Sequence, residues 1–339
     1  MITERFAAQL LTGPPARSPE EVTGRLLAVQ GQDPRGARLA IRPRSAGLTA
    51  ADVDRALTGG TLLITWLNRG TLHLVCREDY WWLHALTTPP LVTGNARRLA
   101  QEGVTPEAAD RAVAVIEKSL ADEGPLTRPQ LRDRIAAAGV RTEGQALVHE
   151  LLLACLRGIA VRGPMTGREH AYVLVREWLG PPRPFDRTQA LAELARRFLA
   201  GHGPAAERDL AKWAGLPLRD ARSGLTAISA ELIQRPDGLA DLAALAGPRD
   251  QGLPPPRLLG SFDPLLHGWV SREPILGQHT GIITVNGLFR PFALVEGRAV
   301  ATWSLPGGVV ELDWLAEVSA AAREALAADA ADVRRFLGL

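Results

Sequence analysis

A pattern repeated at a separation of 79 residues constrains the fold of this chain more than any other feature of its sequence. Residues 112–131 and 191–210 both carry apolar side chains at helical spacing, followed by a Gly-Pro pair and a short second helix. In both copies a leucine, Leu131 or Leu210, stands six residues after that proline. A helix, a tight turn and a short helix begin a helix-turn-helix unit, so the repeat predicts at least two such units.

The segments around these copies predict three winged-helix units in tandem. In the second unit, residues 101–182, a third helix is followed by two short strands that form a wing. The third unit spans residues 183–248, and the first spans residues 1–100 with a longer insertion. The first unit is expected to contain helices over residues 3–11, 19–29 and 49–57 and a hairpin of strands 61–66 and 71–76.

The last part of the chain differs in composition from the rest. Residues 249–256, RDQGLPPP, are typical of a linker. Residues 257–311 are rich in glycine and β-formers and predict a small β-barrel or curled sheet, and residues 314–336 predict a closing helix. The expected fold class is therefore α+β and mainly α, with three winged-helix units before a small β-barrel and a C-terminal helix over 257–339. The lack of βαβ alternation and of a Gly-rich phosphate loop argues against a nucleotide-binding fold.

Charge is balanced over the whole chain but not along it. The chain has 39 basic and 37 acidic side chains, yet the first hundred residues hold 12 basic and 8 acidic ones, and residues 301–339 hold three and six. Arginine forks match phosphate oxygens, so a local run of arginines is typical of a nucleic-acid-binding surface. A GC-rich genome, which encodes arginine everywhere, is the competing explanation and is favoured by composition alone. The densest run, without an acidic residue, consists of Arg35, Arg38, Arg42 and Arg44.

Several classes of protein are excluded by what the sequence lacks. No apolar run approaches the roughly 20 residues that a membrane span needs, and the first residues lack the apolar region of a signal peptide. Cys76 and Cys155 provide neither a disulfide framework nor a CxxC pair, and no histidine or carboxylate cluster has metal-ligand spacing. We therefore expect a cytoplasmic protein with no membrane partner, no metal and no cofactor.

Two glutamines separated by one residue, Gln30 and Gln32, form one candidate site. In an extended segment, side chains two residues apart face the same side, so both carboxamides would project together. Such a pair can hold a water molecule or the edge of a base. The alternative is an ordinary helix exit, and the residues by themselves favour that interpretation.

Two further pairs of residues were candidates for chemistry. Arg69 and His73 could reach DNA from a wing, although a turn residue and a hydrogen-bonded strand histidine explain them equally well. Asp263 and His267 have no serine or cysteine nucleophile close by, so we interpret them as a capped turn and a satisfied histidine.

Four blocks of this sequence resemble the bacterial winged-helix DNA glycosylases, the AlkZ-like family associated with azinomycin self-resistance and the unhooking of interstrand crosslinks. The resemblance runs from about residue 20 to the end of the chain, and the blocks occur in the same order. They are VQGQDPRGARLAIRPRS, TWLNRGTLHLV, LLGSFDPLLHGW and NGLFRPFALVEGRAVATW.

The resemblance implies catalytic roles for Gln30 and Gln32. The signature of the family is a glutamine, an apolar residue and then a glutamine or an aspartate, and Gly31 stands here in the apolar position. The resemblance also implies an open DNA channel, with the four arginines of the run as phosphate contacts and a hairpin near residues 281–289 that probes a groove.

The function expected from the resemblance is that of a monofunctional DNA glycosylase. Its partner would be double-stranded DNA with N7-alkylated purines or crosslinks, and the chain would act as a monomer. A non-catalytic winged-helix transcription regulator is the alternative, although regulators usually dimerise on palindromes and no dimerisation segment is evident. A family member that has lost activity through Gly31 is a third possibility.

Overall fold

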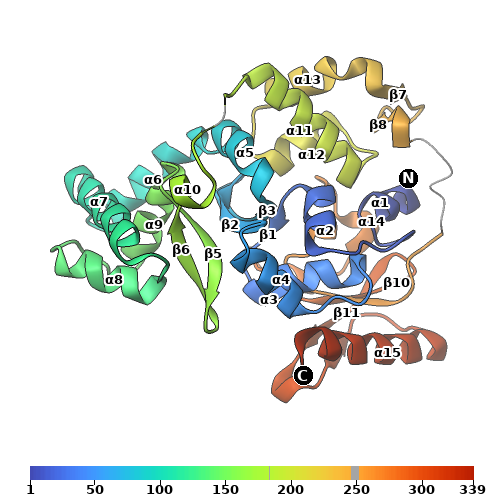
Figure 1. Ribbon diagram of the computed structural model, residues 1–339. Helices are drawn as coiled ribbons and strands as arrows, with labels where there is room; N and C mark the ends of the chain where they lie inside the picture. Colours follow the sequence, from blue (N-terminus) through green and yellow to red (C-terminus); the bar gives the residue numbers. More distant parts are fainter. Residues whose placement is uncertain (183, 246–251) are drawn as a thin grey trace. The chain divides into compact units, whose positions relative to one another are not determined.

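The computed structural model describes residues 1–182, 184–245 and 252–339 (Figure 1). The chain divides into two compact units: unit 1 consists of residues 1–53 and 188–339, and unit 2 of residues 54–187. Part of the predicted linker, residues 249–251, lies outside the described residues. The four predicted domains divide the chain more finely than these two units, and their boundaries stay predictions.

Unit 2 is built on one antiparallel sheet in which its strands follow the order β3-β2-β5-β6-β4. Helix α9 is apolar on nearly every side and packs against α6, α7, β2 and β5, so it forms the core of this unit. The elements are β2 (Leu62–Leu67), β3 (Thr71–Cys76), α5 (Tyr80–Thr87), α6 (Pro89–Gln101), α7 (Pro106–Glu123), β4 (Leu126–Thr127), α8 (Arg128–Ala137), α9 (Ala146–Leu156), β5 (Ala160–Thr166), β6 (Glu169–Leu174) and α10 (Val175–Trp178).

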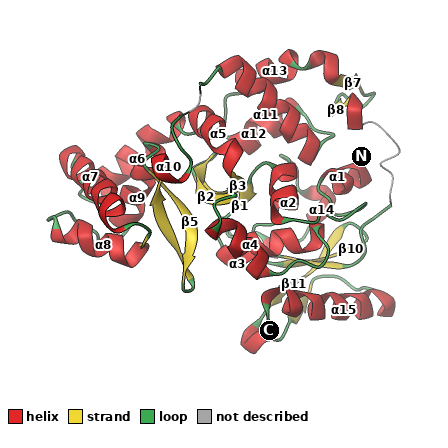
Figure 2. Ribbon diagram, viewed as in Figure 1, coloured by secondary structure: helices red, strands yellow, loops and turns green. Residues whose placement is uncertain are grey.

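The order α7, α8, α9 and the β5–β6 hairpin agrees with the predicted helix, short helix, third helix and pair of strands. The short strand β4 lies between the first two helices, where the sequence predicts only a turn. Strand β4 is short and pairs with β6, with Leu126 opposite Tyr172. Helix α8 begins at once because Thr127 and Gln130 form a capping box. Figure 2 shows helices α7, α8 and α9 beside the β5–β6 hairpin.

Unit 1 contains a second segment with the same order of elements. Ala205 lies 79 residues after Leu126 and bridges Ala240, a residue of the last strand, just as Leu126 pairs with β6. Leu131 and Leu210 are both buried, at 0% and 1% exposure, so the repeated leucine has the same role in each copy. The elements are α11 (Arg187–His202), α12 (Glu207–Ala214), α13 (Leu218–Ala227), β7 (Leu232–Gln234) and β8 (Ala240–Leu242).

The first part of the chain contains the helices and the hairpin that the sequence predicts, and three helices that it does not predict, α3, α5 and α6. Helix α4 (Ala50–Thr58) crosses the boundary between the units. The elements before it are α1 (Ile2–Ala8), α2 (Pro19–Leu26), β1 (Val29–Gln30), α3 (Pro34–Ile41) and the 3-10 helix η1 (Arg42–Arg44).

The C-terminal part of unit 1 corrects the predicted barrel. Within the described residues its strands form an open antiparallel sheet in the order β12-β11-β10-β9, because four strands of three to seven residues are too few and too short to close. The predicted closing helix also begins later, at Ser319, whose hydroxyl caps it. The elements are β9 (Arg257–Leu259), α14 (Glu273–Leu276), β10 (Phe292–Val295), β11 (Arg298–Ser304), β12 (Glu311–Trp314) and α15 (Ala320–Leu337).

The coarse prediction of a fold that combines helices and sheets is confirmed, and more of the described residues lie in helices than in strands. Along the described residues, no helix has the length and apolarity that crossing a membrane requires.

Candidate active site

The two glutamines lie in different environments. Gln30 ends strand β1 and is 7% exposed, and its Oε1 has no hydrogen-bond donor among the described residues. Gln32 is exposed, and the backbone bends there before helix α3 begins. The extended segment therefore ends before Gln32, which corrects the expectation that both carboxamides project from one side of a strand.

Helix α3 follows the glutamines directly and is capped by Asp33. The Asp33 Oδ1 accepts a hydrogen bond of 3.0 Å from the backbone N–H of Arg35, and Pro34 occupies the first helical position. The other carboxylate oxygen, Oδ2, accepts a hydrogen bond from the hydroxyl of Ser261. The Asp-Pro pair is a recognised helix start, so this helix could have been found from the sequence.

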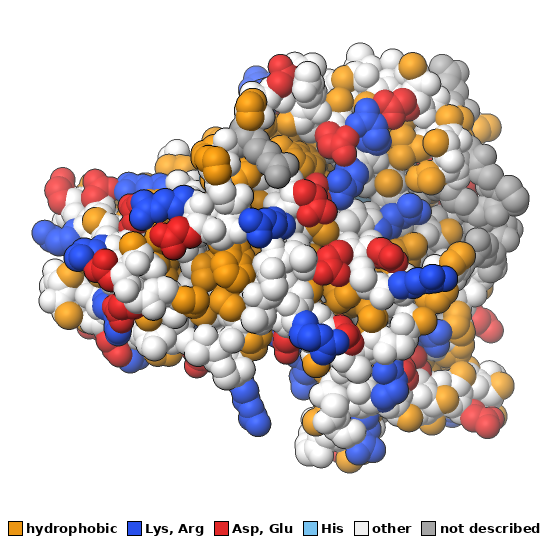
Figure 3. All heavy atoms as spheres, viewed as in Figure 1, with side chains coloured by type: hydrophobic (Ala, Val, Ile, Leu, Met, Phe, Trp, Pro, Cys, Tyr) orange, Lys and Arg blue, Asp and Glu red, His pale blue; other side chains and the backbone are white. Residues whose placement is uncertain are grey.

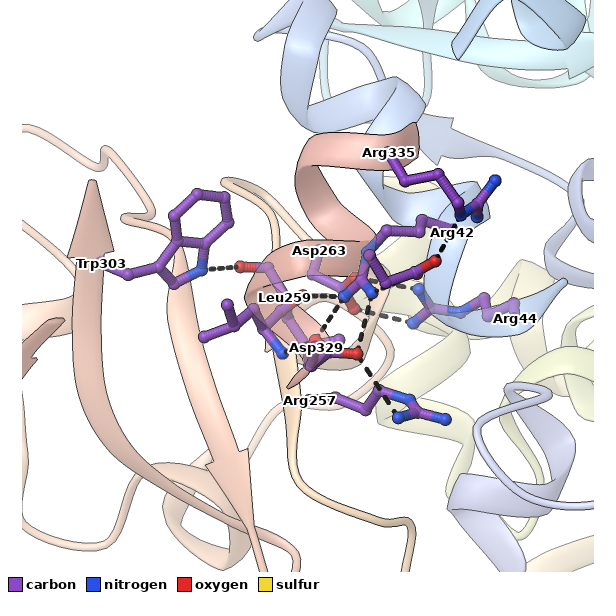
Figure 4. A network of polar contacts seen from close by, with 10 residues as sticks. Arg42, Arg44, Arg257, Leu259, Asp263, Trp303, Asp329 and Arg335 are labelled. Atoms are coloured by element: carbon purple, nitrogen blue, oxygen red, sulfur yellow. Dashed lines mark hydrogen bonds and ion pairs between the residues drawn. The ribbon is translucent and has the colours of Figure 1, made fainter. Parts of the chain in front are cut away.

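Arg42, predicted to contact phosphate, is instead buried at 4% exposure (Figure 4). Its guanidinium makes two hydrogen bonds of 2.9 and 2.8 Å to Asp329, and it also reaches Asp332 at 2.9 Å and the carbonyl of Leu258 at 2.6 Å. Burial by itself would lower the pKa of Arg42, but the hydrogen bonds and charges of Asp329 and Asp332 outweigh it and raise that pKa. Arg42 therefore joins α3 to the C-terminal helix.

Arg44 is likewise a structural residue. It is completely buried and makes a two-point ion pair with Asp263, at 2.7 and 2.9 Å (Figure 4). It also donates to the backbone carbonyl of Gln9 at 3.0 Å. The prediction of phosphate contacts at Arg42 and Arg44 is wrong, because both side chains are buried and their terminal guanidinium nitrogens donate to acceptors of the protein.

The other two arginines of the run differ from each other. Arg38 is 9% exposed and donates to the carbonyl of Pro34 at 2.7 Å, so it too is poorly placed for DNA. Arg35 is exposed at the start of α3. On the face drawn in Figure 3, basic side chains are interspersed with acidic ones, so the positive charge on this face is scattered.

In unit 2, the β2–β3 hairpin carries the other predicted DNA contacts, Arg69 and His73. Arg69 is exposed in the turn, whereas His73 is 3% exposed and its Nδ1 lies 2.9 Å from the carbonyl oxygen of Thr71. Burial, aided by the charge of Arg69, lowers the pKa of His73 to about 3, so the ring is neutral at physiological pH. The prediction of a DNA contact at His73 is therefore wrong, because the ring is a buried, neutral strand residue.

The interpretation of Asp263 as a capping residue is confirmed. Its carboxylate accepts a hydrogen bond of 2.9 Å from the N–H of Leu265 and caps a short 3-10 helix, Pro264–Leu266. The ring of His267 packs against the ring of Phe289, with 4.4 Å between the two ring centroids. The described parts of the chain hold no cluster of three or more residues suited to a metal ion.

The class of protein is that of the DNA glycosylases, enzymes that hydrolyse N-glycosidic bonds. The family model described as "DNA glycosylase AlkZ-like" matches residues 23–336. The match covers most of the chain, including both glutamines. The chain therefore belongs to the AlkZ-like DNA glycosylase family.

A sequence relative and a solved structure show how similar the chain is to known glycosylases. The interstrand DNA cross-link repair glycosylase of Streptomyces sahachiroi is 26% identical, and the match covers 89% of this chain and 86% of that protein. The solved structure of the Streptomyces sahachiroi DNA glycosylase AlkZ matches with a TM-score of 0.79 at 24% identity, over 100% of this chain and 96% of that one. This structural similarity shows that the two proteins share a fold.

Proposed function

We propose that the chain hydrolyses the N-glycosidic bond of cationic N7-alkylpurine adducts in double-stranded DNA, and that Gln30 and Gln32 carry the reaction. The observation that supports this most is the buried Oε1 of Gln30, which has no donor among the described residues. An unsatisfied buried oxygen costs about 1–3 kcal/mol, and such costs are retained where a site uses them. Gln32, exposed two residues further on, can reach substrate.

The chemistry suits neutral side chains. A purine alkylated at N7 already carries a positive charge, so it leaves without being protonated. Water attacks C1′ while the bond to N9 breaks, the bonding electrons neutralise the purine, and the proton of the water passes to solvent. Gln32 holds the water, and the Oε1 of Gln30 stabilises the positive charge that develops on the sugar.

Interstrand crosslinks through purine N7 present the same leaving group. The relative from Streptomyces sahachiroi is described as an interstrand DNA cross-link repair glycosylase, and the same substrate class is proposed here. A crosslinked base cannot be extruded into a closed pocket, so the reaction takes place in the duplex. Removal of such lesions would give the host resistance to a DNA-alkylating natural product.

Further parts of the chain are proposed to hold the DNA. We interpret the repeated helix, strand, helix, helix and hairpin order as winged-helix units, with Arg35 and Arg69 as phosphate contacts of a monomer. The turn around Val285 and Leu288 is closed by a hydrogen bond of 2.9 Å between Thr284 and Leu288. Val285 is fully exposed and Leu288 is 56% exposed, as suits an apolar wedge in a DNA groove.

The test is the release of free 7-methylguanine from a duplex by purified variants. Gln30→Ala and Gln32→Ala are expected to reduce the single-turnover rate by about 10²–10³-fold, the usual loss when one stabilising group is removed. Gln101→Ala is the matched control, since Gln101 is exposed on α6 and its side chain accepts a hydrogen bond from Arg98. Wild-type rates in both site variants would overturn the proposal, and DNA binding without base release by the wild type would favour a regulator.

A further inference from the structure

We propose that the hydrogen bond between Asp33 and Ser261 positions Gln32 for the reaction, and that these two are positioning residues for catalysis. The inference rests on the proposed function of Gln32. It concerns a bond between the start of α3 and the segment after β9, residues that lie 228 positions apart in the sequence.

The side chain of Gln32 is not held in place by contacts of its own. Its side chain is exposed and, within the described residues, makes no hydrogen bond. Gly31 before it has no side chain to pack and leaves the backbone freer than any other residue would. The first residue next to Gln32 whose side chain is held by others is Asp33.

The two carboxylate oxygens of Asp33 have separate tasks. Oδ1 accepts from the N–H of Arg35 and caps the helix, which many polar side chains can do. Oδ2 accepts a hydrogen bond from the hydroxyl of Ser261. A residue at position 33 can make this second bond, in addition to the cap, only if its side chain has a second polar atom. The first bond stabilises α3, and only the second bond fixes the residue beside Gln32 to another part of unit 1.

The segment that carries Ser261 is itself held firmly. Leu259 accepts a hydrogen bond of 2.8 Å from the indole of Trp303, and the N–H of Leu258 donates to Asp329 at 2.7 Å (Figure 4). The backbone of this segment also lies directly against α3. A Cβ at Gly36 would overlap the carbonyl oxygen of Ser261, and a Cβ at Gly260 would come within 2.8 Å of the Cβ of Leu39.

The far end of α3 is fixed by different bonds. Arg42 and Arg44 hold it to Asp329 and Asp263 through buried ion pairs. These ion pairs hold the C-terminal end of α3 in place, but Arg42 and Arg44 lie at the opposite end of the helix from the glutamines. Loss of the bond at Asp33 therefore leaves α3 folded and docked while Gln32 gains freedom.

The test separates capping from positioning with two variants. Asp33→Ser keeps a good helix cap but cannot reach Ser261, and Ser261→Ala removes the donor. Both are expected to lower the single-turnover rate of 7-methylguanine release by about 10- to 100-fold, since small misplacements of catalytic groups have effects of this size. The dissociation constant for DNA is expected to stay within about two-fold, because the bond acts on the reaction and not on binding.

Two further variants complete the design. Asp33→Asn keeps one oxygen to cap the helix and presents an amide N–H that can donate to the hydroxyl oxygen of Ser261, so it is expected to restore at least half of the rate. The double variant Asp33→Ser/Ser261→Ala is expected to lose no more than either single one. Thr105→Ala, which removes the side-chain cap of α7, is the matched control and should leave the rate unchanged. A wild-type rate in folded Asp33→Ser, additive losses in the double variant, or loss of folding in Ser261→Ala would each overturn the inference. The Gln32→Ala result is independent of these, so failure of the proposed function can be told apart.

Discussion

The polar side chains before and after Asp33 in the sequence differ in their hydrogen bonding. Before it, the Oε1 of Gln30 is buried without a donor, and Gln32 is exposed without a hydrogen bond in the described structure. After it, Arg42 and Arg44 are buried and use their guanidinium groups on carboxylates and backbone carbonyls. Adjacent residues of one segment thus serve different purposes, and being close to the site in sequence does not make an arginine a DNA contact.

The difference separates buried polar groups that stabilise the fold from one that lowers its stability. Charges in the α3 region are compensated by ion pairs, so they support the scaffold. The glutamine segment leaves a polar atom uncompensated, as functional sites often do. Each prediction below changes one side of this contrast and measures whether stability or activity responds.

The largest effect on stability is expected for Arg44→Ala. Removal of this side chain leaves Asp263 buried and unpaired, and breaking a buried pair costs about 3–5 kcal/mol of unfolding free energy. Urea denaturation followed by circular dichroism measures the loss. Arg334→Ala, an exposed change on α15, should stay within about 0.5 kcal/mol of the wild type. Equal stabilities for the two variants would show that Arg44 is not part of the scaffold.

Glu150 of α9, in unit 2, is a buried carboxyl group for which, unlike Asp263 and Asp329, no ion pair is found among the described residues. Its side chain is completely buried, and neither carboxylate oxygen has a donor among the described residues. Burial, with a contribution from the charge of Glu143, raises its pKa from 4.5 to about 7. The carboxyl is therefore protonated below that pH in the folded protein.

A raised pKa makes the folded state the stronger proton binder, so stability is fully present below pH 4.5 and falls as the pH rises through 7. We expect the wild type to lose about 3 kcal/mol of unfolding free energy between pH 4.5 and 8 relative to Glu150→Gln. Denaturation curves of both proteins across this range provide the measurement. Parallel pH dependences would mean that Glu150 ionises normally.

The smallest effect is expected for Arg35→Ala, the exposed arginine of the run. Its loss should weaken DNA binding several-fold without changing stability, and should reduce the slope of log affinity against log salt by about one. Fluorescence anisotropy at several salt concentrations tests this, with Arg334→Ala as the control. An unchanged salt slope would place Arg35 away from the phosphates.

The helices and hairpins could be predicted because their signals are local. Apolar spacing, the Gly-Pro pairs and the leucine six residues after each proline locate the repeat. The strand position at Leu126 recurs at Ala205, as the 79-residue separation requires. Helix α3 is not among the predicted helices although Asp33-Pro34 marks its start, because the arginines that follow favour a nucleic-acid-binding surface there.

The roles of the arginines could not be predicted in this way. The partners of Arg44 and Arg42, Asp263 and Asp329, lie 219 and 287 residues further along the chain. No periodicity or local motif connects residues so far apart. The same holds for Asp33 and Ser261, and the number of strands that would close a barrel is likewise set by packing and not by local pattern.

The most direct measurement of the central claim compares bases released by the wild-type chain from otherwise identical duplexes. One duplex contains 7-methylguanine, a cationic base, and the other contains uracil, a neutral one. Two carboxamides can hold water and stabilise charge on the sugar but cannot protonate a leaving base. We expect release of 7-methylguanine and no release of uracil or of undamaged purine. Release of uracil at a comparable rate would contradict the roles proposed for the two glutamines.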